Sequence, residues 1–191
     1  MKEHLRKKFH YLNALQIEQL EQYMMGVLEL NMSINLTAIT DESEFIEKHY
    51  VDSLSLNGLA LFKTAGRIID VGTGGGFPGV PLAISNPDRE FFLMDSLKKR
   101  LNVIDELTAR LNIYNVTTVH ARAEELGQDI DFRESFDLCI SRAVASLPVL
   151  LEYCLPLVKP SGYFIAYKGP KANEEIALSK NALGQLGGEL I

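Results

Sequence analysis

The sequence predicts an α/β fold in which helices cover both faces of a mostly parallel β-sheet. Three observations support this prediction. From Gly66 onward, short apolar runs of strand length alternate with segments of helical period. A glycine-rich turn follows the first run, where folds of this class carry a ligand-binding loop. The segment before Gly66 has helical periodicity and predicts a helical cap.

Length and composition indicate one globular unit. The chain has 191 residues, of which 47% are hydrophobic and 23% charged. We expect an N-terminal helical cap, residues 1–62, packed on a ligand-binding core, residues 63–191. No apolar run approaches the roughly 18 residues of a membrane span. The basic first residues lack the apolar segment of a secretory signal, so we expect a cytoplasmic protein without membrane association.

Charge and cysteine content exclude some classes of site. The net charge of −6 gives no global attraction for nucleic acid, so any RNA site must be a local patch. Cys139 and Cys154 fall within apolar runs, and the sequence has no CxxC motif and no clustered histidines. We therefore expect two buried, reduced thiols and no metal site.

The N-terminal quarter contains two predicted helices. Apolar residues recur at spacings of three to five between residues 12 and 30 and predict an amphipathic helix. The polar segment 31–40 breaks it. Asp41, with Glu44 three places later, forms a capping pattern that opens a second helix through Phe45, Ile46 and His49.

Five strand-length runs follow in the core. They are RIIDV, FFLMD, NVTTVH, FDLCIS and GYFIAYK. Helical segments are predicted between and after them, at residues 81–84, 97–111, 122–129, 147–157 and 174–186. This alternation is typical of crossover units and predicts parallel strands.

The strongest local signal is the turn IDVGTGGGFPG after the first run. Gly72, Gly74 and Gly76 allow positive φ and let backbone approach a ligand, and the next helix aims free N–H groups at the turn. Phe77 occupies the third glycine position of a dinucleotide fingerprint, which argues against NAD. With Asp70, the pattern resembles motif I of class I S-adenosylmethionine-dependent methyltransferases, which have a Rossmann-like fold. A tight turn without a ligand is the alternative.

Charged residues follow the second run. Asp95 ends that run, where an acidic side chain can accept hydrogen bonds from both ribose hydroxyls. Capping of the helix that begins near Ser96 explains it equally well. Lys98, Lys99 and Arg100 stand in the first turn of that helix, where the helix dipole disfavours cations. An anionic partner would explain them, and so would a solvated helix start.

Other polar residues lie near the same predicted sheet edge. Arg142 follows the fourth run, where its guanidinium can bind a carboxylate or phosphate or pair with a neighbouring acid. Lys168 closes the fifth run and either holds substrate or reaches solvent. His49 and Asp52, three residues apart, form either a polar pair near the ligand or ordinary capping and core hydrogen bonds.

Several separated motifs together resemble one family, the bacterial RsmG group, also called glucose-inhibited division protein B. The resemblance covers residues 30–170, and the run Gly76-Phe77-Pro78-Gly79-Val80-Pro81 is its most specific part. The other motifs are Asn35-Leu36-Thr37, His49-Tyr50-x-Asp52-Ser53-Leu54, Asp95-Ser96-x-Lys98-Lys99-Arg100, Arg122-Ala123-Glu124 and Ser141-Arg142-Ala143-Val144-Ala145.

The resemblance implies methyl transfer from S-adenosylmethionine to guanine N7 in a loop of 16S ribosomal RNA, with that RNA or the small ribosomal subunit as partner. It implies cofactor contacts at Gly72, Phe77, Ala123, Glu124 and Arg142. Guanine N7 carries an exposed lone pair, so no catalytic acid or base is expected. Arg142 and Lys168 are candidates to position the base. Family members continue with further strands and a basic tail, so we expect C-terminal strands of the fold to be missing.

Three other functions remain open on the sequence. The same fold can methylate another acceptor, because the fold does not determine the substrate. A noncatalytic RNA-binding or ribosome-assembly module is also compatible with the charge. An NAD-linked oxidoreductase is the third, and Phe77 in place of the third glycine weakens it.

Overall fold

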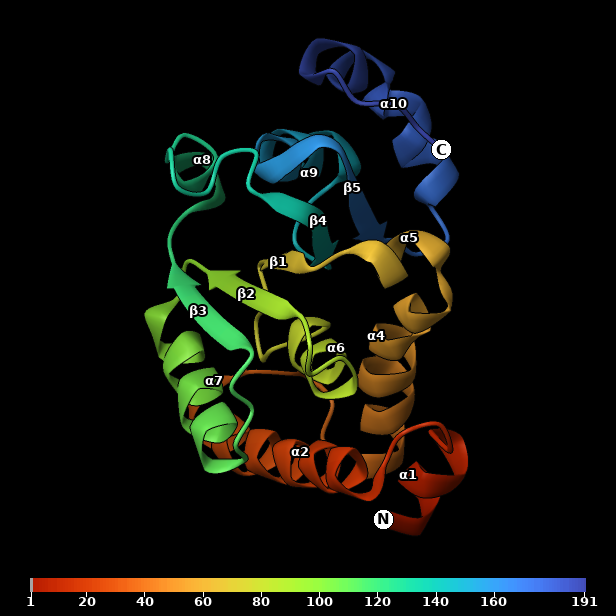
Figure 1. Cartoon of the computed structure of the whole chain (residues 1–191), viewed down its shortest axis with the longest axis vertical. Helices are drawn as coiled ribbons and strands as arrows, with labels where there is room; N and C mark the ends of the chain where they lie inside the picture. Colours follow the sequence, from red (N-terminus) through yellow and green to blue (C-terminus); the bar gives the residue numbers. More distant parts are fainter. Residues whose placement is uncertain (1) are drawn as a thin grey trace.

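The computed structural model describes residues 2–191 and contains a five-stranded parallel sheet with helices on both faces (Figure 1). The strand order is β3-β2-β1-β4-β5, and every neighbouring pair is parallel. The strands are β1 (Arg67–Val71), β2 (Glu90–Asp95), β3 (Val116–His120), β4 (Phe136–Arg142) and β5 (Val158–Tyr167). The predicted α/β fold is confirmed.

The helices include all those that the periodicity predicts and two that it does not, α1 and α5. Before the sheet lie α1 (Lys2–Lys8), α2 (Ala14–Ile34), α3 (Glu42–Phe45), the π-helical turn η1 (Ile46–Val51), α4 (Asp52–Leu54), the 3-10 turn η2 (Ser55–Gly58) and α5 (Ala60–Thr64). Between and after the strands lie α6 (Gly79–Ser85), α7 (Lys98–Arg110), α8 (Ala123–Leu126), α9 (Leu147–Cys154), the 3-10 turn η3 (Leu155–Leu157) and α10 (Ala172–Leu186).

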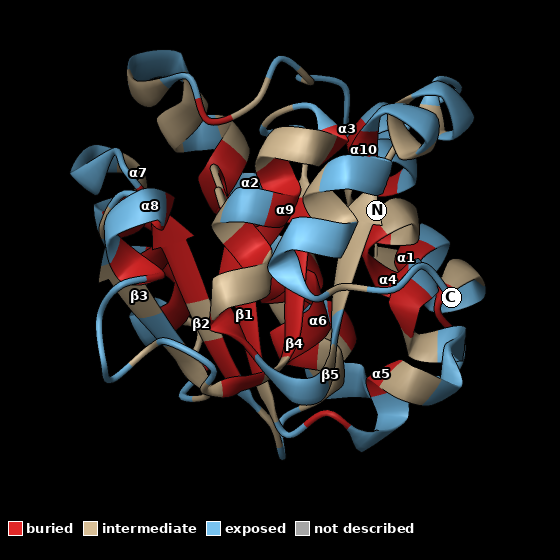
Figure 2. Cartoon of the chain, turned by 90° about the horizontal axis from the view of Figure 1, so that it is seen from above, coloured by how far each residue is buried: buried red, intermediate tan, exposed pale blue. Residues whose placement is uncertain are grey.

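The two faces of the sheet bury two separate hydrophobic clusters. Successive strand side chains point to opposite faces. Ile68 of β1 packs in one cluster with residues of α2, α6 and α7, and Ile69 packs in the other with residues of α8 and α9. Figure 1 shows α2, α4, α6 and α7 on one side of the sheet and α8 and α9 on the other. Strands β1 and β4 are largely buried between these layers (Figure 2).

Helix α2 begins with a complete capping box. The Asn13 side chain accepts from the Gln16 amide, and the Gln16 side chain accepts from the Asn13 amide, both at 2.9 Å. The helix continues four residues past the predicted end and stops at Asn35, which has a left-handed conformation. Gly26 lies where α2 packs against α7, and a Cβ there would lie 2.4 Å from Leu107 Cδ2. Only a glycine fits this approach without displacing Leu107.

The segment from Glu42 to Leu54 is a helical run with a π-helical turn in its middle. Asp41 accepts a hydrogen bond from the Glu44 amide at 2.8 Å, as the capping pattern predicts. The π-helical turn contains His49 and is not visible in the periodicity. It places His49 and Asp52 above the end of β4, where they meet Arg142.

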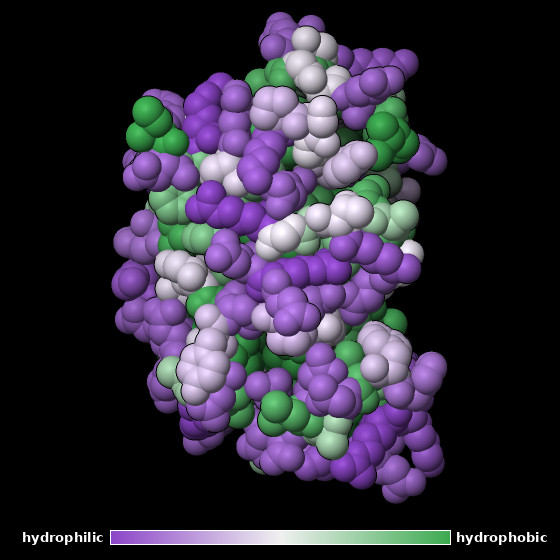
Figure 3. Space-filling model, in the orientation of Figure 1, coloured by the Kyte–Doolittle hydropathy of each residue, from purple (hydrophilic) through white to green (hydrophobic). Residues whose placement is uncertain are grey.

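Burial of the remaining side chains fits a globular chain. Cys139 of β4 and Cys154 of α9 are free and buried in the second cluster, as predicted. The face in Figure 3 is mainly hydrophilic, with scattered hydrophobic groups. Among residues 2–191, no helix combines the length and apolar character needed to cross a membrane, and no three His, Cys, Asp or Glu side chains are grouped to hold a metal ion.

Candidate cofactor and substrate site

The glycine turn after β1 requires glycine for two reasons. Gly72, Gly74 and Gly76 have φ of +76°, +58° and +90°, a conformation that other residues rarely adopt. A Cβ on Gly72 would also lie 2.3 Å from Val144 Cγ2, and one on Gly76 would lie 2.3 Å from the Tyr23 hydroxyl. The turn is held to β2 because the Gly72 and Thr73 amides both donate to the Met94 carbonyl, at 2.9 and 3.0 Å.

The buried Asp70 side chain links the start and the end of this turn by hydrogen bonds. Its Oδ2 accepts from Thr73 Oγ1 at 2.7 Å and from the Gly79 amide at 2.9 Å. Its Oδ1 is buried and has no hydrogen-bond partner among the described residues. Burial raises the Asp70 pKa to about 6, although both hydrogen bonds and Arg142 act in the opposite direction. Asp70 is not on the cavity wall, so its cofactor contact stays a prediction.

A cavity of about 320 Å³ opens at the carboxyl edge of the sheet, where folds of this class bind ligands. Four predicted cofactor residues line it, namely Gly72, Asp95, Ala123 and Glu124. The remaining lining residues are Val71, Met94, Ser96, Arg100, Ala121, Arg122, Ala143, Val144 and Tyr153.

Asp95 lies on the cavity wall and also supports the backbone. Its Oδ2 accepts from the Gly74 amide at 3.0 Å, and its Oδ1 accepts from the Leu97 amide at 2.8 Å, just before α7. The N-cap residue of α7 is Leu97, and no side chain caps this helix, so the interpretation of Asp95 as the helix cap is wrong. Asp95 lies on the cavity wall, and its contact with a ribose stays a prediction. Arg100 Nη1 lies 3.5 Å from Asp95 Oδ2, and Arg100 Nε is buried without a partner among the described residues.

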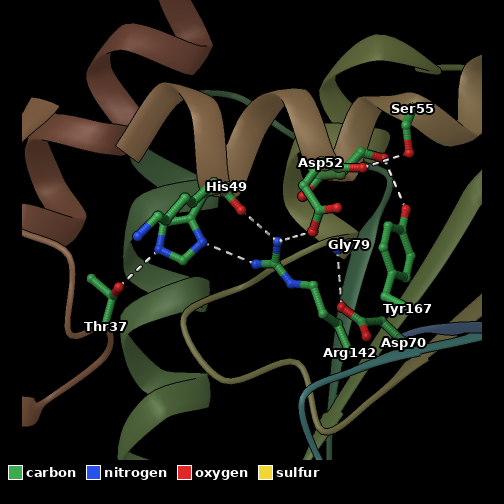
Figure 4. Close-up of polar contacts among 10 residues, drawn as sticks. Thr37, His49, Asp52, Ser55, Asp70, Gly79, Arg142 and Tyr167 are labelled. Atoms are coloured by element: carbon green, nitrogen blue, oxygen red, sulfur yellow. Dashed lines mark hydrogen bonds and ion pairs between the residues drawn. The ribbon is translucent and has the colours of Figure 1, made fainter. Parts of the chain in front are cut away.

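Beside the cavity, Arg142 connects β4 to the helical cap (Figure 4). Its Nη1 donates to Asp52 Oδ2 at 2.7 Å and to the Lys48 carbonyl at 2.9 Å, and its Nη2 donates to His49 Nδ1 at 3.0 Å. A guanidinium only donates, so Nδ1 is the acceptor and Nε2 carries the hydrogen that reaches Thr37 Oγ1 at 2.8 Å. Burial, followed by the charge of Arg142, lowers the His49 pKa to about 4.

Phe77 lies on the side of the turn that faces the cap. Only 5% of the residue is exposed. Its ring stacks on His49 with centroids 4.3 Å apart and meets the edges of Phe45 and Tyr23 at 5.4 and 6.0 Å. These contacts place Phe77 in an aromatic cluster and not on the cavity wall. Its contact with a cofactor stays a prediction.

Lys168 and the lysines of α7 have different surroundings. Lys168 Nζ donates to the Ala145 carbonyl and pairs with Glu175 Oε2, both at 2.7 Å. The same Glu175 oxygen accepts from the Leu147 amide at 2.6 Å. Lys98 and Lys99 are exposed in the first turn of α7, as predicted.

The sequence did not identify Val144 or Tyr153 as wall residues. Val144 belongs to the motif Ser141-Arg142-Ala143-Val144-Ala145, two residues after Arg142, and that motif was the available signal. Tyr153 lies inside an apolar helical segment, and nothing in the sequence around it pointed to a place on the cavity wall. Both reach the cavity because β4 and α9 bring distant parts of the chain to one edge.

The sequence model of the family GidB, described as rRNA small subunit methyltransferase G, matches residues 16–190. The chain belongs to the GidB family. Two GidB relatives named "Ribosomal RNA small subunit methyltransferase G" illustrate the similarity. The protein of Clostridium novyi (strain NT) is 47% identical over 93% of this chain and 73% of its own length. The protein of Lachnoclostridium phytofermentans is 50% identical over 94% of this chain and 74% of its own length.

Solved structures give the same fold at low sequence identity. An O-methyltransferase from Bacillus cereus in complex with SAH has a TM-score of 0.59 at 18% identity, over 85% of this chain and 79% of that one. The O-methyltransferase TomG from Streptomyces achromogenes, in complex with SAM, has a TM-score of 0.56 at 18% identity, over 88% and 78%. This GidB protein is thus a methyltransferase-family enzyme that uses S-adenosylmethionine, and an NAD-linked oxidoreductase is excluded.

Proposed function

We propose that this chain transfers the methyl group of S-adenosylmethionine to N7 of a guanine in a loop of 16S ribosomal RNA. Its partner is that RNA or the small ribosomal subunit, in the cytoplasm. One observation carries the proposal. This chain belongs to the GidB family, and the cavity at the carboxyl edge of its sheet is lined both by Gly72 of the glycine turn and by Asp95, the acidic residue at the end of the next strand.

The residues around the cavity fit the chemistry of S-adenosylmethionine. The Asp95 carboxylate lines the wall and can accept from a ribose diol. The backbone of Gly72 on the wall suits the methionine portion, with Gly74 following it in the same turn, and Ala123 and Glu124 on the wall suit the adenine. Gly76, Phe77 and Asp70 would support the turn from its other side. When bound, the cofactor supplies an electrophilic methyl carbon on a sulfonium.

The reaction requires that the base be aligned with the methyl group, and it requires no proton transfer before attack. Guanine N7 presents a lone pair on its major-groove edge, so nothing has to be deprotonated before attack. The chain contributes by holding N7 in line with the methyl carbon. Arg142 stands next to the cavity residue Ala143 and is the candidate to hold the base. His49 is neutral near pH 7, since its pKa is about 4.

Methyl transfer to isolated 16S rRNA and to small subunits lacking the modification tests the proposal. We expect labelled methyl groups to appear as N7-methylguanine in the digested RNA. Transfer to a different acceptor, with none to rRNA or subunits, would overturn the substrate, and cofactor binding without transfer would favour a noncatalytic RNA-binding module.

Gly72→Val tests the placement of the cofactor. The substitution adds a side chain where φ is positive and Val144 is adjacent, so we expect the affinity for S-adenosylmethionine to fall at least about a hundredfold. Gly58→Val is the matched control, because a Cβ on Gly58 meets nothing within 4 Å and its φ is not positive. Calorimetric titration measures both. Unchanged affinity in folded Gly72→Val would contradict the placement.

A further inference from the structure

The loop that follows β4 forms one wall of the cavity. Ala143 and Val144 line it, and Ala143 has a φ of +57°, in the left-handed region. Val144 covers Gly72 so closely that a Cβ there would be 2.3 Å from its Cγ2. The position of Val144 therefore sets how much room remains above the glycine turn.

The far end of this loop is held by two side chains that are remote in the sequence. Glu175 of α10 accepts from the Leu147 amide at 2.6 Å and pairs with Lys168 at 2.7 Å. Lys168, just beyond β5, donates to the Ala145 carbonyl at 2.7 Å. The Ala145 carbonyl and the Leu147 amide, on either side of Ser146, are thus both hydrogen-bonded to the same ion pair.

This ion pair replaces a missing local cap. Leu147 is the first residue of α9, and Ser146 at its N-cap position makes no side-chain cap hydrogen bond. The first amides of a helix have no partner within the helix, and a carboxylate there is stabilised by the helix dipole. The hydrogen bond from Lys168, followed by that from the Leu147 amide, lowers the Glu175 pKa. Glu175 is therefore ionised near pH 7.

Both side chains are partly sheltered from water. The exposed fraction is 14% for Lys168 and 27% for Glu175. Hydrogen bonds with a charged partner are stronger than neutral ones, and a less exposed ion pair is screened less by salt. The ion pair between Lys168 and Glu175 is thus suited to fixing the loop, and through it α10 contacts the loop that lines the cavity.

We propose that Glu175 and Lys168 are positioning residues for the methyl donor, which fix the 143–147 loop and, through Val144, the wall above Gly72. The inference rests on the proposed function, because it assumes that the cavity holds S-adenosylmethionine. Neither residue lines the cavity. Their effect is on its affinity, so that α10 contributes to the site without entering it.

Affinity for S-adenosylmethionine, measured calorimetrically on the full chain, tests the inference. We expect Glu175→Ala to raise the Kd roughly tenfold, as the loss of a charged hydrogen-bond partner does. Glu175→Gln keeps an acceptor for the Leu147 amide but cannot pair with Lys168, so a smaller increase is expected. Glu174→Ala, which removes the adjacent exposed carboxylate, is the matched control and should leave the Kd unchanged.

Amide hydrogen exchange without ligand separates this inference from the proposed function. In Glu175→Ala, residues 143–147 should exchange faster than in the wild type, whereas β1 should not change. A wild type that binds no S-adenosylmethionine contradicts the proposed function, and the exchange result still decides whether the loop is held as inferred. Lys168→Met repeats both measurements if Glu175→Ala does not fold. Unchanged affinity or unchanged exchange in a folded variant of the pair overturns the inference.

Discussion

His49 shows how a buried neighbourhood determines the protonation of one side chain. The ring is enclosed by Phe77 on one face, and both nitrogens are hydrogen-bonded, Nδ1 to Arg142 and Nε2 to Thr37. Protonation would place a second donor against a guanidinium that cannot accept. The neutral form therefore belongs to the folded state.

The acid sensitivity of the fold should depend partly on His49. Its pKa is about 4 in the folded chain and about 6.5 when unfolded. The unfolded chain takes up the proton first, so the stabilising contribution of the neutral ring is present above pH 6.5 and lost as the pH falls toward 4. Denaturant unfolding at pH 7 and pH 5 measures it. His49→Gln should lose less stability over this interval than the wild type.

Asp70 acts in the opposite direction over the same interval. Its pKa in the folded chain, about 6, lies above the ordinary value of 3.8, so its contribution is present below pH 3.8 and lost as the pH rises through 6. The wild type and the His49→Gln variant both keep Asp70, so the difference between their losses of stability from pH 7 to pH 5 reports on His49 alone. Equal pH dependence of wild type and His49→Gln would contradict the assignment.

At the scale of elements, glycines have opposite roles in two helices. Gly26 allows α2 to approach α7, where Leu107 is fully buried and has little room to move. Gly184 in α10 faces open space, because a Cβ there meets nothing within 4 Å. The same substitution should therefore have opposite effects at these two positions.

Thermal and denaturant unfolding of two alanine variants checks this expectation. Gly26→Ala should lower the free energy of unfolding by about 1–2 kcal/mol, because overpacking outweighs the gain in helix propensity. Gly184→Ala should raise it by roughly 0.5–1 kcal/mol. A stabilised Gly26→Ala variant would show that Leu107 gives way easily.

The predictability of the elements depended on how local their signals are. The five strands were predicted because each is a short apolar run, as in RIIDV before the glycine turn, and the helices between them because their apolar residues repeat with the helical period. The capping pattern at Asp41 and Glu44 predicted a helix through His49 but not its π-helical turn, which depends on how the cap meets β4. The short helices α1 and α5 offered too few residues for a period.

The candidate site was predicted less completely, because it depends on contacts between distant residues. His49, Asp52 and Arg142 were each singled out, but no local pattern joins positions about 90 residues apart. The same holds for Glu175, whose carboxylate caps a helix 28 residues earlier in the chain. Gly72 and Asp95, which line the cavity, could be singled out from the sequence because each lies at the end of an apolar strand-length run.

For the whole molecule, the helical cap and the sheet share one hydrophobic core. Leu20, Tyr23 and Phe45 of the cap pack in the same cluster as Ile68 and Leu138 of the sheet. We propose that residues 1–62 are a cap on the core formed by residues 63–191, within one structural unit. Such a shared core leaves neither part with a complete interior of its own.

Cooperative unfolding tests this organisation. Far-ultraviolet and near-ultraviolet circular dichroism should give coincident transitions, and the most protected amides of α2 and β1 should exchange with free energies of opening that agree within about 1 kcal/mol. Hydrogen exchange resolved by residue measures this. Exchange of all α2 amides long before those of β1 would show that the cap unfolds separately.

The two cysteines give the native chain a built-in reporter. Cys139 lies on β4 and Cys154 on α9, and burial raises the pKa of the Cys139 thiol well above its ordinary value. Both sulfurs are buried, so an alkylating reagent cannot reach either of them while α9 stays packed on the sheet. The rate at which such a reagent labels folded protein therefore measures how often α9 lifts from the sheet, without any introduced dye.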